Sequence, residues 1–248
     1  MRGVAWQIDE VEHALGLIAE GLIDYEVGRK TGIPRSTILN WRKGHLRQRQ
    51  PRGASGPEEL EAASYAYLLG QYLGDGCQFR TGKRGWGLRI SSDAAYVQII
   101  DECCRTIEQV RGRRPYVYHC PGKRLATITS CWMTWPCLFP QHGPGRKHHR
   151  SIALVPWQVE LVEAEPGRFV RGLIHSDGWR GLNRVRVKGR DYAYPRYQFS
   201  SRSDDIRQLF VYGCELLGIA WRPWGRYHVS VARRESVALL DEHVGPKR

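Results

Sequence analysis

Apolar and polar positions from residue 59 onward predict one order of elements that occurs twice. Each copy opens with an apolar helix that ends in Asp-Gly, at 75–76 and at 177–178. Two strands, a helix, two more strands and a closing helix follow. The expected ranges are 77–82, 85–92, 93–110, 115–120, 124–130 and 131–139, then 181–189, 194–201, 203–217, 219–223, 226–233 and 235–243. The pattern predicts an α+β fold made of two αββαββα repeats.

The two helices that open the repeats carry small residues four positions apart, which are Gly70 and Gly74 in the first and Gly172 and Ser176 in the second. Small residues at this spacing allow two helix backbones to approach closely. We therefore expect the helices to pack side by side, with Gly76 and Gly178 as helix stops. The carboxylates just before these glycines then lie together, and paired carboxylates favour a hard cation. The alternative is two core helices that end in ordinary Asp-Gly turns.

Residues 1–45 predict a small all-α domain with helices near 9–20, 24–30 and 35–43. Gly32-Ile33-Pro34 forms the expected turn between the last two helices, as in a helix-turn-helix. This stretch resembles the helix-turn-helix of resolvases and transposases, which implies that the third helix enters the major groove. The implied base and phosphate contacts are Arg35, Ser36, Thr37 and Asn40, with Arg42 and Lys43 on the DNA backbone. The alternative is a helical bundle that binds protein.

The rest of the chain divides by composition. Residues 46–58 form a basic linker, 59–150 the first repeat, 151–167 an inter-repeat linker and 168–248 the second repeat. The seven cysteines are expected to be buried thiols in a reducing cytosol. A zinc site from Cys131, Cys137 and His142 with Cys120 or His119 fits no common spacing.

The charge of the chain indicates which class of partner it binds. The formal net charge is +13 and the isoelectric point is near 9.7, which favours a polyanion and, among polyanions, nucleic acid. Residues 109–159 and 216–234 contain no Asp or Glu. No signal peptide and no run of 18 apolar residues is found, so we expect a cytoplasmic, nucleoid-associated protein with no membrane partner and no small-molecule substrate.

The predicted strands alternate polar with apolar residues, which places the polar side chains on one face of a sheet. The polar sets are Arg184, Arg186 and Lys188; Arg196 and Gln198; Arg226 and His228; and Arg89 in the first repeat. Arg and Gln are the side chains that read guanine and adenine, and a two-stranded ribbon fits the major groove. These residues are expected to bind double-stranded DNA.

The paired Asp-Gly helices and the two repeats resemble the LAGLIDADG homing endonuclease family in its single-chain form. The resemblance implies two pseudo-twofold repeats that form a DNA-binding saddle, with Asp75 and Asp177 as metal ligands. It also implies basic or amide groups near the metal, for which Lys147, Lys247 and, less clearly, Gln198 are the matches. His175 is expected to pack or to face solvent.

The expected function is Mg²⁺-dependent, site-specific cleavage of double-stranded DNA at a long asymmetric site, by a monomer. The N-terminal helix-turn-helix departs from the family habit. Some bacterial regulators join this scaffold to a helix-turn-helix and bind DNA without cutting it, but in those the order is reversed and the acidic pair is usually degraded. Two alternatives remain, a non-cleaving transcriptional regulator and an RNA-binding splicing helper.

Overall fold

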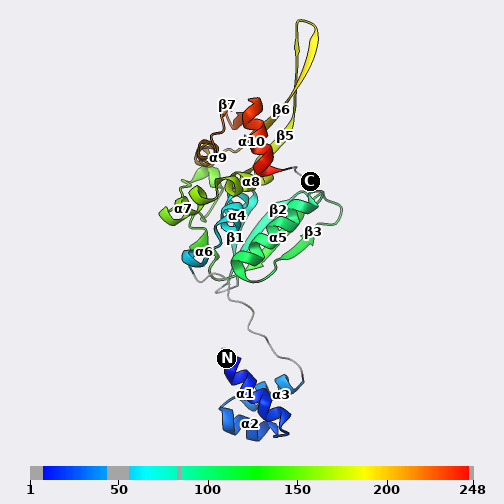
Figure 1. Ribbon diagram of the computed structural model, residues 1–248, viewed down its shortest axis with the longest axis vertical. Helices are drawn as coiled ribbons and strands as arrows, with labels where there is room; N and C mark the ends of the chain where they lie inside the picture. Colours follow the sequence, from blue (N-terminus) through cyan, green and yellow to red (C-terminus); the bar gives the residue numbers. More distant parts are fainter. Residues whose placement is uncertain (1–7, 44–55, 83–84, 246–248) are drawn as a thin grey trace. The chain divides into compact units, whose positions relative to one another are not determined.

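The computed structural model describes residues 8–43, 56–82 and 85–245. The chain divides into two compact units between residues 51 and 52, and each has its own apolar core. Figure 1 labels the elements of both units.

The first unit contains three helices, α1 (Ile8–Ala19), α2 (Asp24–Thr31) and α3 (Arg35–Arg42), and the predicted helices are confirmed. Gly32 ends α2 with a φ of 73°, in the left-handed region that favours glycine. The core of the unit is formed by Ala14, Leu17, Val27, Ile33, Ile38 and Trp41.

The second unit contains the two predicted repeats. The first consists of α4 (Ala62–Asp75), β1 (Gly76–Thr81), β2 (Gly85–Ser92), α5 (Val97–Arg111), β3 (Tyr116–His119), β4 (Ala126–Cys131) and α6 (Trp135–Leu138). The second consists of α8 (Pro166–Asp177), β5 (Gly178–Val187), β6 (Arg190–Ser200), α9 (Asp204–Leu216), β7 (Arg222–Trp224), β8 (His228–Val231) and α10 (Arg234–Val244). Between them lies α7 (Pro156–Ala164), and two short 3-10 turns are found at Pro57–Glu59 and Lys147–His149.

Each repeat forms one antiparallel four-stranded sheet. The strand orders are β1-β2-β4-β3 and β5-β6-β8-β7, so the two sheets have the same topology. The predicted α+β fold with two equivalent repeats is therefore confirmed. Several ranges were too long. Helix α6 has only four residues, because β4 continues through Cys131. Helix α5 begins at Val97, and β7 and β8 are shorter than expected.

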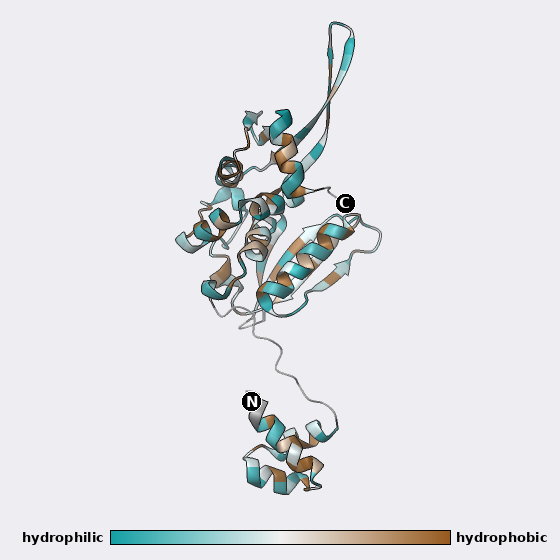
Figure 2. Cartoon of the chain, viewed as in Figure 1, coloured by the Kyte–Doolittle hydropathy of each residue, from teal (hydrophilic) through white to brown (hydrophobic). Residues whose placement is uncertain are grey.

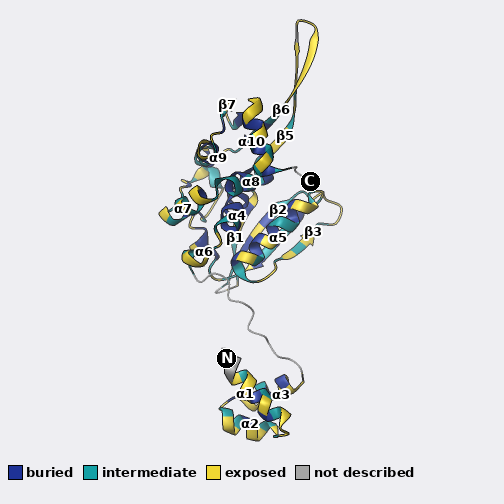
Figure 3. Ribbon diagram, in the orientation of Figure 1, coloured by how far each residue is buried: buried dark blue, intermediate teal, exposed yellow. Residues whose placement is uncertain are grey.

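Helices α4 and α8 pack against each other at the centre of the second unit, where most residues are buried (Figure 3). A Cβ atom on Gly172 would lie 3.0 Å from the Cα of Gly70, and a Cβ on Gly70 would lie 2.5 Å from the carbonyl oxygen of Phe169. No larger side chain fits between these backbones. The glycines thus set the separation of the two helices.

The hairpin β5–β6 extends past its own sheet (Figure 1). Only Tyr197 to Ser200 of β6 pair with β8, so residues 181–196 form a two-stranded ribbon. Hydrophilic residues predominate along this ribbon (Figure 2). The first repeat has no equivalent, because β1 and β2 are shorter.

Candidate active site

Asp75 and Asp177 end α4 and α8, at the points where each helix passes directly into a strand. The following glycines are extended, with φ of −89° at Gly76 and −95° at Gly178. Both glycines end their helices as expected, but in an extended conformation and not in the left-handed one that glycine often adopts at a helix end. A Cβ on Gly76 would lie 2.5 Å from the Cα of Tyr72, and one on Gly178 2.5 Å from the Cα of Ile174. Glycine is needed here because the strand leaves the helix without a loop.

The two carboxylate-bearing helix ends lie side by side. A Cβ on Gly74 would lie 3.0 Å from Oδ2 of Asp177, so the missing side chain of Gly74 gives that carboxylate its space. Asp75 is exposed and Asp177 is half-buried. The C-terminal end of a helix carries partial negative charge and disfavours a carboxylate. A cation between the two helix ends relieves both this cost and the repulsion between carboxylates.

Lys147 lies at the same helix end. Its Nζ donates to the carbonyl oxygens of Tyr72, Leu73 and Gly74, the last two at 3.0 Å. A lysine ammonium has three N–H donors, and these contacts use all three. Lys147 therefore holds the end of α4 in place and supplies positive charge there.

The pKa of Lys147 is lowered from 10.5 to about 8. Burial is the main cause, because it disfavours the charged form. The charges of Asp177 and Asp75 act in the opposite direction and keep the pKa from falling further. The lysine is thus electrostatically coupled to both carboxylates.

A cavity of about 1020 Å³ opens over the carboxylates and is lined by both repeats. The first repeat contributes the end of α4, the start of β1 and residues 142–150, and the second contributes Asp177, residues 200–203 and residues 227–228. Asp75 and Asp177 are the only acids among its lining residues, against the four Lys and Arg residues Arg146, Lys147, Arg150 and Arg202. The basic side chains suit a polyanion, and the two carboxylates suit a metal ion that the polyanion would also contact.

A cation at this place needs ligands beyond the protein. Within residues 8–43, 56–82 and 85–245, no group of three or more His, Cys, Asp or Glu side chains could hold a metal ion. The zinc combination of Cys131, Cys137 and His142 is therefore not formed. The expectation of buried cysteines is wrong for Cys77, Cys131 and Cys137, whose side chains are exposed. Two carboxylates bind a hard cation weakly by themselves, and phosphate oxygens or water would have to complete the shell.

The sequence reasoning missed several residues of the cavity wall, among them Arg146, His148, Arg150 and Arg202. Arg150 shapes the loop before Lys147, because its Nη1 donates to the carbonyls of residues 143, 144 and 145 at 2.7, 3.2 and 2.9 Å. The run Arg146-Lys147-His148-His149-Arg150 was the available signal. Nothing in its letters showed that it folds over the aspartates.

One of the expected catalytic residues, Gln198, does not line this cavity. Gln198 is half-buried on β6, opposite Trp179 and Ser230, and is absent from the cavity lining. Ser200, two positions on along the same face of β6, does line the cavity, so the role of Gln198 beside the metal stays a prediction. Lys247 lies outside the described residues.

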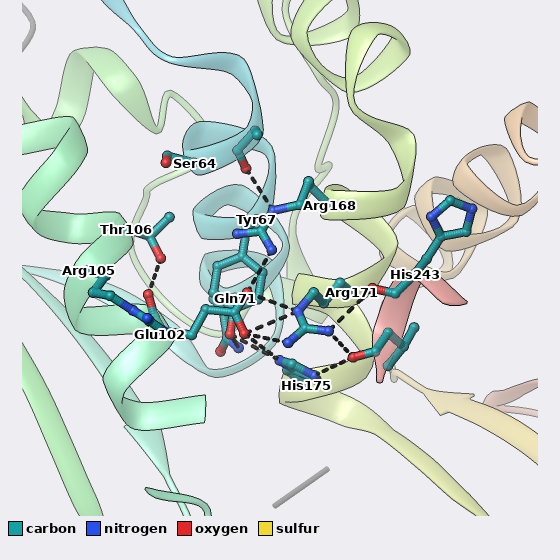
Figure 4. Close-up of polar contacts among 12 residues, drawn as sticks. Ser64, Tyr67, Gln71, Glu102, Arg105, Thr106, Arg168, Arg171, His175 and His243 are labelled. Atoms are coloured by element: carbon teal, nitrogen blue, oxygen red, sulfur yellow. Dashed lines mark hydrogen bonds and ion pairs between the residues drawn. The ribbon is translucent and has the colours of Figure 1, made fainter. Parts of the chain in front are cut away.

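His175 is buried and belongs to a polar network that joins the two repeats (Figure 4). Its Nδ1 lies 3.0 Å from the hydroxyl of Tyr67, and its Nε2 lies 3.2 Å from the carbonyl oxygen of Val244. Glu102 of α5 accepts from Arg168 at 2.7 Å and from Arg171 at 2.8 Å. His175 is thus an interior packing residue, as one of the two expectations had it.

The register of β5–β6 corrects the predicted basic face. Arg180 pairs with the buried Tyr197, and its strand neighbours two and four positions on, at 182 and 184, share that side of the ribbon. Arg184 and Arg186 therefore lie on the opposite face from Arg196 and Gln198, and the expectation of one common face is wrong. Arg186 is ion-paired with Asp191, at 3.7 Å.

Two more residues of that set lie in turns. Lys188 occupies the tip of the hairpin with a φ of 49°, and Arg226 lies in the turn between β7 and β8. His228 is on β8 across from Ser200 and does line the cavity. The face that carries Arg196 and Gln198 also carries the exposed aromatics Trp179, Tyr192, Tyr194 and Trp224.

In the first sheet, Arg89 pairs with Cys77 and Thr129 and lies over the ring of Phe79, at 4.6 Å. Thr129 pairs with the exposed Tyr116, so this tyrosine shares the face of Arg89. The exposed aromatics on both sheets were missed, although aromatic residues at alternating strand positions were visible in the sequence.

In the first unit, Arg35, Ser36 and Asn40 of α3 and Lys43 at its C-terminal cap are exposed, and Thr37 is half-buried. Arg42 is engaged within the unit, because its Nε donates to Asp24 at 2.7 Å and its Nη2 to the carbonyl of Leu22 at 2.6 Å. The side chain of Arg42 is still exposed, so its contact with the DNA backbone stays a prediction.

No family model matches this chain, and no curated protein does. Solved structures do match. Over 75% of this chain and 94% of the other, the fold is similar to that of I-DmoI in a crystal structure with DNA and Ca, with a TM-score of 0.50 and 14% identity. The meganuclease I-SmaMI bound to uncleaveable DNA also matches, with a TM-score of 0.47 and 8% identity over 75% of this chain and 85% of that one. The second unit thus has the fold of LAGLIDADG homing endonucleases. Among the described helices, none has the length and apolar character that a membrane crossing requires.

Proposed function

We propose that this chain is a site-specific, Mg²⁺-dependent endonuclease that cuts double-stranded DNA at a long asymmetric site. The observation that carries the proposal is the pair Asp75 and Asp177 at adjoining helix ends, under a cavity whose other charged lining residues are all basic. Two aspartates with only a structural role would not need such a cavity. A divalent cation would neutralise the two carboxylates, and a phosphodiester would neutralise the Lys and Arg side chains around them.

In this proposal Asp75 and Asp177 hold the cation, with phosphate oxygens and water as further ligands. Bound there, Mg²⁺ would activate a water molecule and stabilise the leaving oxygen. Lys147 is a positioning residue, because its three donors fix the carbonyls at the end of α4 and so orient Asp75. Its charge also limits the repulsion between the two carboxylates before the cation binds.

The aromatic and basic faces of the two sheets supply the proposed DNA contacts, together with the ribbon of residues 181–196. The two repeats differ in sequence, so one chain would read a non-palindromic site without a partner copy. Binding should weaken steeply with salt, since each neutralised phosphate contributes about 0.9 to the slope of log K against log salt concentration. Arg35, Ser36, Thr37, Asn40 and Arg42 of α3, with Lys43 at its C-terminal cap, are proposed as a second, separate DNA contact.

A non-cleaving DNA-binding regulator is the second candidate. The N-terminal three-helix unit favours it, because that unit resembles a helix-turn-helix. The two candidates share every binding feature and differ only in whether the aspartates serve chemistry.

The test is incubation of the full chain with a randomised plasmid library and Mg²⁺, followed by sequencing of cut ends. We expect wild type to yield ends at a defined sequence, and Asp75→Asn and Asp177→Asn to bind the same sequence without cutting it. If wild type binds a defined sequence and leaves it intact, the regulator is the correct function.

A further inference from the structure

Three guanidinium groups surround one aromatic ring next to the active-site cavity. Arg202, Arg207 and Arg226 lie 5.8, 5.9 and 5.2 Å from the centre of the Tyr227 ring. A second cavity of about 310 Å³ opens among them and is also lined by Arg146, His148, His149 and one carboxylate, Asp204. Arg146, His148, Arg202 and Tyr227 line both cavities, so the two are contiguous.

Among the residues that the structure describes, only one of these three arginines, Arg207, forms an ion pair with a carboxylate. Arg207 is ion-paired with Asp204 and donates to the carbonyls of Ser201 and Ser203, so it holds the loop in place. In the described parts of the chain, no carboxylate is ion-paired with Arg146, Arg202 or Arg226. Like charges this close repel one another, and contacts with a tyrosine face offset that only in part.

His148 adds a hydrogen-bond donor to this cavity. Desolvation and the positive charges of Arg202 and Arg146 lower the pKa of its imidazole. The ring keeps at least one N–H in either protonation state. This imidazole and the guanidiniums of Arg146, Arg202 and Arg226 form a site for a phosphate group around the small cavity.

At the equivalent position of the first repeat, the arginine is paired with a carboxylate of the protein. Ser92 pairs with Ala126 there, as Ser200 pairs with His228 in the second repeat. The residue after Ser92 is Asp93, and it is ion-paired with Arg124, two residues before Ala126, at 3.0 Å. At the same two positions, the second repeat has Ser201 and Arg226. The internal carboxylate of the first repeat is thus missing from the second.

We infer that Arg146, His148, Arg202, Arg226 and Tyr227, here called the Tyr227 cluster, bind one phosphodiester of the DNA backbone beside the site of cleavage. The contact belongs to the half of the target held by the second repeat, because Asp93 neutralises the equivalent arginine of the first. This inference rests on the proposed function, since it assumes that DNA enters the active-site cavity. It makes the Tyr227 cluster an anchor on one side of the cut.

The test measures the affinity of the full chain for its selected duplex over a range of salt concentrations, without Mg²⁺. The variants are Arg202→Gln/Arg226→Gln and Ser201→Asp, the second of which restores the carboxylate found in the first repeat. We expect each to bind about tenfold more weakly at 0.15 M salt, and to reduce the salt slope by about 0.9. Arg124→Gln is the matched control and should leave the slope unchanged, because its charge is already paired.

Circular dichroism and the unfolding midpoint check that each variant is folded. Asp93→Ser gives the reciprocal test, because it should open a phosphate site in the first repeat and steepen the slope. If wild type binds the duplex and Arg202→Gln/Arg226→Gln has the same slope and affinity, the inference is wrong while the proposed function stands. If wild type binds no duplex at any salt concentration, the proposed function fails and this inference with it.

Discussion

At the scale of single residues, the sequence identified the centre of the site but not how its parts act. Asp75 and Asp177 stood out because each ends an apolar helix with matched small residues. Lys147 was found by its distance along the chain from Asp75. That its amine faces three helix-end carbonyls depends on the path of residues 139–147, which has no periodic pattern to read. The role of Lys147 as a positioning group came only from the structure.

The lowered pKa of Lys147 gives a prediction. We expect the amine to lose its proton with a midpoint at about pH 8. NMR of the chain with lysine labelled at Cε measures this titration, and Lys147→Arg assigns the signal. Asp177→Asn and Asp75→Asn should each lower the midpoint further, because both carboxylates favour the charged form. A midpoint that stays near the ordinary 10.5 would contradict the buried placement of the amine.

The same shift has a consequence for stability. Between pH 8 and 10.5 the unfolded chain binds more protons than the folded chain, so the contribution of Lys147 becomes more favourable as pH rises through this window. Relative to Lys147→Met, wild type should gain about 3 kcal/mol across it. Urea unfolding at pH 7.5 and pH 10.5 measures the difference.

Glu102 is predicted to be the residue on which the polar network of Figure 4 depends. Its side chain is 12% exposed and faces both Arg168 and Arg171, so Glu102→Gln leaves two guanidiniums without their carboxylate. We expect a loss of about 3 kcal/mol in the free energy of unfolding at pH 7. Asp101→Asn, on the same helix and in an exposed ion pair with Arg105, is the control and should cost less than about 1 kcal/mol.

The pH dependence of this variant has a defined sign. Burial alone raises the pKa of Glu102, but hydrogen bonds and charge from Arg171, with the charge of Arg168, outweigh it and lower the pKa below 4.5. The stability that Glu102 adds is therefore present above pH 4.5 and is lost as pH falls through its folded pKa. The gap between wild type and Glu102→Gln should narrow in acid, and a constant gap would argue against the ion pairs.

At the scale of elements, most helices and strands were predictable, while strand register was not. Alternation showed that Arg184 and Arg186 share a face and that Arg196 and Gln198 share a face. Whether these two pairs lie on the same face of the ribbon depends on the turn between the strands. A shift of the strand register by one residue moves one pair to the other face. The two-residue turn at Lys188-Gly189, with φ of 49° and 78°, sets them opposite.

The crossing of α4 and α8 gives a prediction at this scale. Gly172→Ala should lower the free energy of unfolding of the second unit by about 3 kcal/mol, because the added Cβ meets the backbone of α4. Gly143→Ala is the matched control, since its Cβ would lie 3.5 Å from Arg150, an ordinary contact. Both are measured by urea unfolding, and equal costs for the two variants would contradict the close crossing.

At the scale of the whole molecule, the repeat was visible because its elements recur in order, although few letters match. The asymmetry between the repeats was harder to see. The ribbon of residues 181–196 and the exchange of Asp93 for Ser201 become meaningful only when the sheets are aligned by register. Under the proposed function, they make the two DNA-binding halves around the shared carboxylate pair unequal.

In the proposed function, the carboxylate pair cuts the DNA that the sheets hold. Single-turnover cleavage of the selected duplex in Mg²⁺, with the bound fraction determined in the same reaction, tests this. We expect wild type to cut the bound duplex, while Asp75→Asn and Asp177→Asn bind an equal fraction and cut at least about 100-fold more slowly, as expected for the loss of about 3 kcal/mol of transition-state stabilisation. Equal cutting by wild type and both variants, or a fully bound duplex that wild type leaves intact, would show that the carboxylate pair does not cut this DNA.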